Sequence, residues 1–266
     1  RESFSLYGQG TLNISETLRV SSGLRYSRDT FSTDVTNFLN VESFQEEGTT
    51  DEITSRVVAE VDFSEDLMGY FALARGFKPG GSNLTFGFDD DTAPPRVFPT
   101  FEAETVDSVE FGLKSTFADG AARANIAVFS YTYENLQFQA TDPDIYRGGV
   151  ANIPESEMSG LEVEFTGFLT DSLSLDMNLA FLDSEVTSDY EVLDNVDAYP
   201  YFFGEEDIRY GLRENVKGNQ LAKTPELTAD ITLKHETNLA SGNSLTTIVQ
   251  YVKRGDFQQR VSNNPT

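Results

Sequence analysis

Apolar and polar residues alternate through the segment LEVEFTGFLTDSLSLDMNLAFL (161–182), with one break at 170–172. Leu161 and Val163 lie on one side of an extended chain, and Glu162 and Glu164 lie on the other. A period of two on both sides of a short, turn-forming break is typical of two paired strands. The segment therefore predicts a β-hairpin with one apolar face.

The same alternation recurs along the whole chain, and no convincing helical periodicity interrupts it. It is clean in most strands, but the fourth and sixth predicted strands are apolar on both sides, so their faces stay unassigned. The pattern predicts ten strands, at residues 2–12, 17–31, 51–63, 67–77, 104–117, 122–141, 157–169, 173–186, 225–239 and 244–257.

Short and long connections alternate strictly between these strands. The short ones contain Gly, Asp, Asn or Ser, which favour tight turns, and lie at 13–16, 64–66, 118–121, 170–172 and 240–243. The long ones lie at 32–50, 78–103, 142–156 and 187–224. A soluble sandwich gives no reason for such regularity, whereas outer-membrane barrels combine short periplasmic turns with long extracellular loops.

Strand length supports a membrane barrel. Residues 161–169 and 173–181 are nine residues each, close to the ~9–11 that a tilted strand needs to cross a bilayer. We therefore predict an all-β fold, a partial transmembrane antiparallel up-and-down β-barrel of about ten strands. Its apolar face would meet lipid, and Glu162 and Glu164 would face a hydrated lumen. The alternative is a soluble secreted all-β sandwich, a binding or structural protein whose apolar faces pack together.

Composition narrows the function classes further. The 266 residues carry 19 basic and 44 acidic side chains, a net charge of −25, which argues against binding nucleic acid. No apolar run approaches the ~18 residues of a membrane helix, so a membrane role needs strands. The absence of cysteine excludes disulfides and thiolate sites. The 21 Phe and 11 Tyr fit aromatic girdles at the two membrane interfaces.

The direction of the strands places both ends of the sheet. The first strand leads into the short turn at 13–16, and the tenth leads away from the short turn at 240–243. Both termini are therefore expected on the long-loop side. Because complete bacterial barrels normally begin and finish at the periplasm, we expect residues 1–266 to be an internal section of a longer barrel.

Five stretches carry a family resemblance in a fixed order. They are SLYGQGTLNISETLRVSSGLRYSRDTF (5–31), YFALARGFKPGGSN (70–83), ETVDSVEFGLKSTFADGAARANIAVFSYTYENLQFQ (104–139), NIPESEMSGLEVEFTG (152–167) and KGNQLAKTPELTADITLKHE (217–236). Together they cover more than half of the chain, which resembles the TonB-dependent outer-membrane receptors.

That resemblance implies a 22-stranded barrel around an N-terminal plug, with the plug, the first strands and the last strands lying outside residues 1–266. It also implies TonB-dependent active uptake of a scarce bulky nutrient, most often a ferric siderophore. The implied partners are TonB, reached through the plug, the ligand, and outer-membrane lipid and lipopolysaccharide.

Catalytic and metal-binding chemistry finds little support in the sequence. His235 falls in the apolar register of the ninth strand, where an interfacial role is favoured over a metal ligand or base. Glu162 and Glu164 share one strand face, whereas glycoside hydrolysis needs opposed carboxylates. The acidic run 89–91 lacks the spacing of a calcium loop, and the glycine-rich 76–81 lacks a phosphate-loop pattern. We predict no enzyme, no metal site and no cofactor.

The longest connection, 187–224, is the best candidate for ligand binding. Aromatic and cationic side chains on an exposed loop suit an anionic, partly aromatic ferric chelate. The alternative is that these aromatics only fold the loop onto the barrel rim. The predicted contacts are Tyr199, Tyr201, Phe202, Phe203, Arg209, Tyr210 and Arg213, joined by Tyr146 and Arg147 on the preceding loop.

Overall fold

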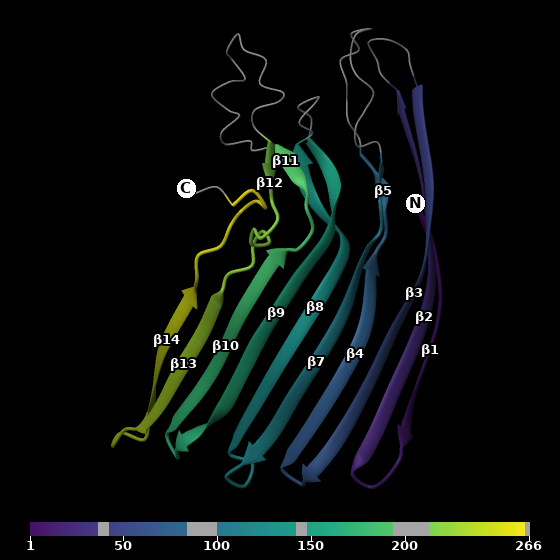
Figure 1. Cartoon of the computed structure of the whole chain (residues 1–266). Coiled ribbons are helices and arrows are strands. Elements are labelled where there is room, and N and C mark those ends of the chain that lie inside the picture. Colours follow the sequence, from purple (N-terminus) through teal and green to yellow (C-terminus); the bar gives the residue numbers. More distant parts are fainter. Residues whose placement is uncertain (37–42, 84–99, 142–147, 194–212, 264–266) are drawn as a thin grey trace, which may run out of the picture.

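Ten long antiparallel strands form one sheet in the order in which they occur along the chain (Figure 1). The computed structural model describes residues 1–36, 43–83, 100–141, 148–193 and 213–263. The strands are β1 (Glu2–Asn13), β2 (Leu18–Thr36), β3 (Ser43–Ser64), β4 (Leu67–Lys78), β7 (Glu104–Phe117), β8 (Ala122–Thr141), β9 (Gly148–Thr170), β10 (Leu173–Val186), β13 (Leu227–Asn238) and β14 (Ser244–Arg254).

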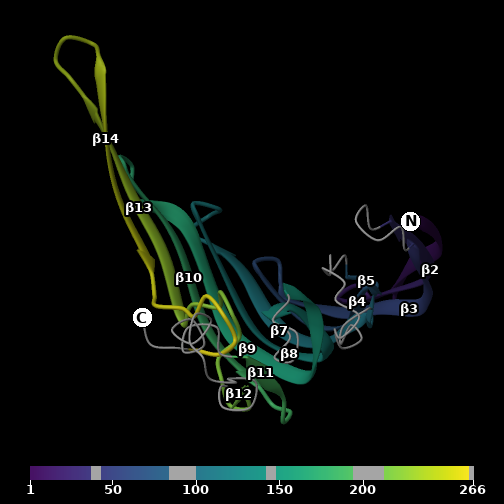
Figure 2. The same cartoon turned by 90° about the horizontal axis from the view of Figure 1, so that it is seen from above.

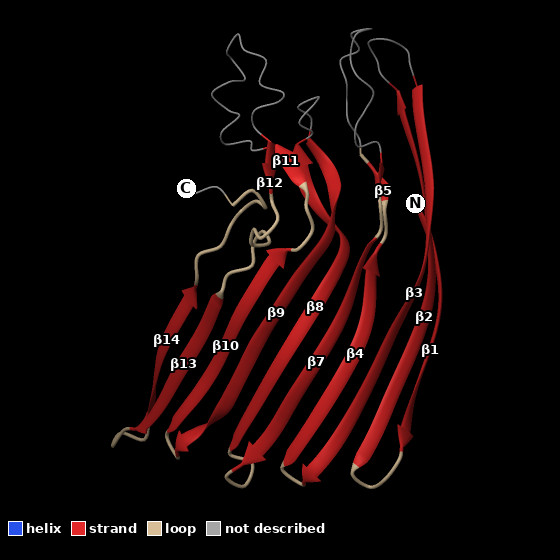
Figure 3. Ribbon diagram, viewed as in Figure 1, coloured by secondary structure: helices blue, strands red, loops and turns tan. Residues whose placement is uncertain are grey.

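The sheet is curved and open, with β1 and β14 as its edges (Figure 2). The five short turns lie together at one end, which we call the turn side, and the strand ends that the longer connections join lie at the other, the loop side (Figure 3). Two small strand pairs lie on the loop side, β5 (Gly81–Ser82) with β6 (Thr100–Phe101) and β11 (Glu191–Leu193) with β12 (Arg213–Asn215). Because the ten long strands lie in one sheet, the sandwich alternative is wrong.

Across the described ranges, no helix has the length and apolar character needed to cross a membrane.

All ten predicted strands are present, but three boundaries differ from the prediction by five residues or more. β2 continues five residues beyond the predicted end, β3 begins at Ser43 instead of 51, and β9 begins at Gly148 instead of 157. The extensions of β2 and β3 consist mainly of polar residues, and that of β9 has apolar Val150, Ala151 and Ile153 on both faces, so none shows a clean apolar alternation. Backbone pairing holds all three extensions to neighbouring strands. β9 has 23 residues and, at ~3.3 Å per residue, spans about 75 Å, roughly three times the apolar band of a barrel.

A continuous apolar row crosses the sheet from the edge strand β1 to β13, next to the other edge strand. Directly opposed residues of antiparallel strands lie on the same face, so the register identifies the row: Leu12, Val20, Ala59, Phe71, Phe111, Val128, Leu161, Phe181 and Leu227. Its large side chains are open to the surroundings, with Phe111 60% and Val128 54% exposed. An exposed apolar surface this wide marks a membrane or protein interface.

The opposite face is polar and is held by cross-strand contacts. A row on it runs through Arg19, Glu60, Tyr70, Gly112, Ala127, Glu162, Ala180, Thr228 and Arg254. This register places Glu162 and Glu164 on the polar face, as predicted. The register also settles which face each side chain of β4 and β8 lies on, which the sequence left open. Tyr70 of β4 and Phe129 of β8 lie on the polar face, where their rings pack over glycines of neighbouring strands.

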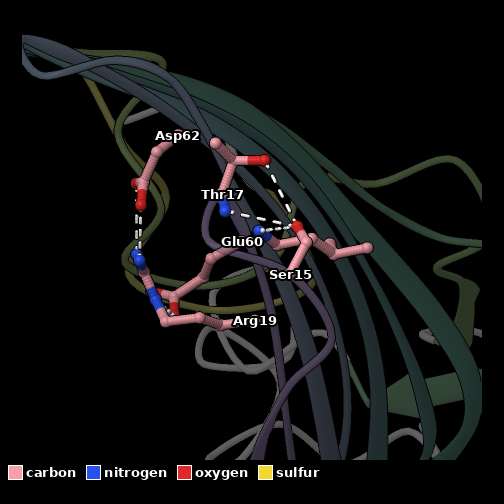
Figure 4. Close-up of polar contacts among 6 residues, drawn as sticks. Ser15, Thr17, Arg19, Glu60 and Asp62 are labelled. Atoms are coloured by element: carbon pink, nitrogen blue, oxygen red, sulfur yellow. Dashed lines mark hydrogen bonds and ion pairs between the residues drawn. The ribbon is translucent and has the colours of Figure 1, made fainter.

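Near the turn side, the polar face carries an ion-pair cluster (Figure 4). The Arg19 guanidinium donates to both carboxylate oxygens of Asp62 and lies 3.5 Å from Glu60. The adjoining turn is closed by Ser15, whose hydroxyl accepts the backbone N–H groups of Thr17 and Leu18. The cluster ties β2 to β3 beside the first turn of the sheet.

The best-buried apolar cluster lies at the loop side rather than at the centre of the sheet. Ile153 of β9 and Val186 of β10 are fully buried there with residues that precede β13 and follow β14. The complete cluster is Ile153, Val186, Val192, Val216, Leu221 and Val261, with Leu136, Phe138 and Tyr190 packed against it. It fixes the segments 216–221 and 258–261 against the ends of β8–β10.

Candidate functional site

A cavity of about 1030 Å³ opens beside this cluster, at the loop-side ends of β4, β7, β8 and β9. Its size suits a bulky ligand, because small-molecule sites typically occupy ~300–1000 Å³. The lining combines aromatic, amide and charged side chains from strand ends and from the two segments packed over them. It includes Lys78, Glu104, Tyr133, Gln137, Phe138, Gln139, Lys223, Gln259 and Arg260.

Gln137 of β8 fixes the wall formed by β4 and β7. Its Nε2 donates to the carbonyl oxygens of Lys78, Pro79 and Glu102, at 3.4, 3.1 and 3.0 Å. Its backbone N–H donates to a carboxylate oxygen of Glu104 at 2.7 Å. One side chain therefore fixes the end of β4 and the approach to β7 at the cavity.

Two asparagines extend this attachment along β9. The side chain of Asn83 pairs with Val150 as a backbone would, accepting its N–H and donating to its carbonyl, both at 2.8 Å. Asn152 accepts the N–H of Glu102 at 2.8 Å and donates back to the Glu102 carbonyl at 3.1 Å. These side chains replace the backbone ladder where β4 and β7 diverge.

The opposite wall depends on the turn 220–224, where Lys223 has a positive φ of 63°. A left-handed backbone costs on the order of 1–3 kcal/mol for a residue with a Cβ. The surrounding structure maintains it: Thr224 Oγ1 donates to the Leu221 carbonyl at 2.7 Å, and Lys223 N donates to the Gln258 carbonyl at 2.7 Å. The turn therefore presents Lys223 to the cavity in a fixed conformation.

Three cations and one carboxylate line this cavity, against 19 cations and 44 acidic residues in the chain. Within the described ranges, the side chains of Lys78, Lys223 and Arg260 make no ion pair or hydrogen bond with protein groups. A cavity with excess positive charge and aromatic walls can bind anionic groups and stack planar ones. No group of His, Cys, Asp and Glu residues in the described part could hold a metal ion.

Most of the predicted ligand contacts lie outside the described residues. Tyr146, Arg147, Tyr199, Tyr201, Phe202, Phe203, Arg209 and Tyr210 are in this group, as is the acidic run 89–91, and their role stays a prediction. The structure places only Arg213, on β12, where its guanidinium lies 3.8 Å from Glu191 across the strand pair.

His235 lies near the turn-side end of β13, opposite Leu173 on the apolar face, where the sequence placed it. Its nearest polar partner is the Thr237 hydroxyl, 3.2 Å from Nδ1. A single hydroxyl contact gives it no acid–base or metal-binding neighbour within the described chain.

Sequence reasoning missed Lys78, Gln137, Lys223 and Arg260. Their strands and connections were predicted, but the cavity joins positions as far apart as Lys78 and Arg260. One signal was available: in an acidic chain, cations recur at loop-side ends of strands, in GFKPGG (76–81), KGNQLAK (217–223) and QYVKRGDFQQR (250–260).

Comparison with known proteins decides the family. The family model described as "TonB dependent receptor-like, beta-barrel" matches residues 1–266, the whole chain. The chain belongs to this family. Members of the TonB-dependent receptor family are transport receptors of the Gram-negative outer membrane, so the apolar face is the lipid-facing surface and the polar face lines the barrel lumen.

Individual members of the family match about 70% of the chain, at less than 30% identity. The chain is 28% identical over 191 residues to the "Probable TonB-dependent siderophore receptor PiuA" of Acinetobacter baumannii, covering 70% of this chain and 24% of that protein. It is 27% identical over 200 residues to the "Pesticin receptor" of Yersinia pestis, covering 72% and 27% respectively. The chain thus spans about a quarter of the length of these relatives.

A solved structure supports the same barrel. The ferric yersiniabactin uptake receptor FyuA from Yersinia pestis superimposes with a TM-score of 0.75 at 19% identity, covering 98% of this chain and 35% of that one. At this identity the likeness shows the fold of the TonB-dependent barrel and does not set the ligand.

Proposed function

We propose that the chain is a section of the barrel wall of a longer TonB-dependent receptor that takes up a bulky nutrient, a ferric siderophore. The loop-side cavity carries this proposal, because it is large, lined by both polar and apolar residues, and lies on the side on which the receptor would meet its ligand. The similarity to the siderophore receptor PiuA and to the ferric yersiniabactin uptake receptor FyuA supports the choice of ligand.

The proposed mechanism involves no covalent chemistry. The ligand binds at the cavity and the neighbouring loops, among them the predicted contacts from Tyr146 to Arg213. A plug within the barrel, driven by TonB, then rearranges and allows passage along the polar face. The lumen-facing carboxylates Glu162 and Glu164 would keep that path hydrated. The transporter would therefore act by binding and conformational change, without enzymatic turnover.

Uptake measurements test the proposal. Cells from which the full-length gene is deleted should take up less radioactive iron from the cognate ferric chelate, and complementation should restore uptake only when TonB is present. A second arm supplies ferric chelates of different chemistry, because the fold leaves the cargo open. Unchanged uptake of every chelate in the deletion strain, under iron limitation, would contradict the proposal.

A further inference from the structure

At each of the three cations of the cavity, contacts with other parts of the chain fix the backbone. The contacts differ from one cation to the next. Lys78 is fixed by the carbonyl contact of Gln137 at 3.4 Å. Lys223 is fixed by the turn 220–224, and Arg260 lies in a segment bonded to that turn. Because the backbone at these positions is already fixed, binding a ligand orders only the side chains, whereas on a free loop the backbone would have to be ordered as well.

Lys223 shows that the arrangement is costly to the chain. Its φ of 63° is a conformation in which glycine would be unstrained. Gly218, five residues earlier, has a similar positive φ of 82° and is a glycine. A lysine at a left-handed position on a cavity wall points to a use for the ammonium group, because strain of this kind concentrates at functional sites.

Hydrogen bonds connect the turn that carries Lys223 to the segment that carries Arg260. Lys223 N donates to the Gln258 carbonyl at 2.7 Å, and Asn219 Nδ2 donates to the Val261 carbonyl at 2.9 Å. The Ser184 and Thr224 hydroxyls, 2.7 Å apart, fasten the same turn to β10. The two cations therefore belong to one hydrogen-bonded wall of the cavity, and Lys78 lies on another.

The single carboxylate of the lining does not neutralise these cations. Glu104 already accepts the N–H of Gln137 at 2.7 Å, and no ion pair joins it to a cation among the described residues. The lining consequently keeps a net positive charge inside a chain of net charge −25. An anionic ligand is attracted to this cavity, whereas a neutral ligand of the same size gains nothing from its charge.

We propose that Lys78, Lys223 and Arg260 form an anion-binding subsite that makes the receptor selective for anionic iron chelates over neutral ones. This inference rests on the proposed uptake function and adds the charge class of the ligand. Carboxylate or catecholate oxygens are the groups that would contact the cations. Gln137 acts as a positioning residue, through the backbone of Lys78.

Chelate binding by the purified full-length receptor tests the proposal. The probes are an anionic iron(III) tris-catecholate and a neutral iron(III) trihydroxamate, each titrated at low and high salt. The wild type should bind the anionic probe at least about tenfold more tightly, with affinity that falls as salt rises. Binding of both probes with equal affinity, or binding of the anionic probe that salt does not affect, would overturn the inference.

Substitutions at Lys223 separate charge from folding. Lys223→Gly removes the ammonium and relieves the backbone strain, so it should leave the thermal midpoint unchanged or raised while weakening the anionic probe about tenfold. Lys223→Arg should restore most of the affinity. The matched control Lys253→Gln removes one cation from β14, outside the cavity, and should change neither value. An anionic affinity within twofold of wild type in Lys223→Gly would contradict the subsite.

Failure of the proposed function has a different signature. If the receptor supports uptake of neutral and anionic chelates equally, the charge inference is wrong while the uptake function stands. If cells take up no ferric chelate through the wild-type receptor, the uptake function is wrong and the inference falls with it.

Discussion

The ring of Tyr70 lies over Gly112, its register partner on the neighbouring strand β7. A Cβ at position 112 would come within 2.2 Å of the Tyr70 ring. The Tyr70 hydroxyl continues past the glycine and donates to Glu110 at 2.5 Å, and the Lys114 ammonium lies 5.4 Å from the ring centroid. The missing side chain of Gly112 thus lets one tyrosine link three positions of β7 on the lumen face.

Adding a side chain at Gly112 should therefore destabilise the barrel. Gly112→Ala would displace the Tyr70 ring and weaken its bond to Glu110, at a cost of about 1–3 kcal/mol. Denaturant unfolding of the refolded full-length receptor measures this. Gly8→Ala is the control, since a Cβ at Gly8 meets no atom within 4 Å. Equal stability of the two variants would show that the ring does not depend on the glycine.

Adjacent residues of β8 should respond oppositely to a new charge. Ile126 lies on the lipid-facing surface between Leu113 and Val163, so Ile126→Arg should cost about 2–4 kcal/mol near the bilayer midplane. Asn125 faces the lumen and donates to Glu164 at 2.9 Å, so Asn125→Arg should be tolerated beside that carboxylate. Folding yield into lipid vesicles compares them. If Asn125→Arg folded worse than Ile126→Arg, the assignment of the faces would be reversed.

The pair β11–β12 should loosen at acidic pH. Hydrogen bonds from Asn215 and Lys217, and the charge of Lys217, hold the pKa of Asp189 below its ordinary 3.8. A lowered folded pKa contributes stability above the ordinary pKa, and this contribution is lost as the pH falls through the lowered value.

Hydrogen exchange of the Val216 amide, which donates to the Tyr190 carbonyl at 2.9 Å, reports this locally. Protection should fall on acidification in the wild type and depend less on pH in Asp189→Asn. Identical pH profiles for the two proteins would exclude Asp189 as the titrating group.

Replacing Gln137 should reduce stability and chelate binding more than replacing its neighbour Gln139, although both residues line the cavity. Gln137→Leu removes the amide group that donates to three backbone carbonyls. The loss should destabilise the β4–β7 wall by about 1–3 kcal/mol. It should also weaken binding of the anionic chelate, because Lys78 loses its anchor. Gln139→Leu is the control and should change both quantities little. Weakened binding without a loss of wall stability would instead place Gln137 in direct contact with the ligand.

The sequence identified the strands where one face meets lipid, because that contact requires strict alternation of apolar and polar residues. It therefore placed the hairpin β9–β10 and the lumen-facing Glu162 correctly. It failed where other forces decide the structure. The extensions of β2 and β3 pair through mainly polar residues, and that of β9 has apolar residues on both faces, so none offers a clean apolar period to detect.

The cavity was out of reach of the sequence for a different reason. Its walls join Lys78 to Arg260, and the positive φ of Lys223 depends on hydrogen bonds to Gln258 and within the turn. Spacing along the chain carries no information about such contacts. The faces of β4 and β8 were ambiguous because Tyr70 and Phe129 are apolar rings that point to the lumen side to cover glycines.

The most direct test of the account is the position of iron in a crystal of the full-length receptor soaked with the anionic iron(III) tris-catecholate. Anomalous scattering locates the iron without reference to the ligand density. We expect a single peak at the loop-side cavity, with the chelate contacting Lys223 and Arg260. A well-occupied iron peak away from that cavity, with no chelate near these two residues, would contradict the account.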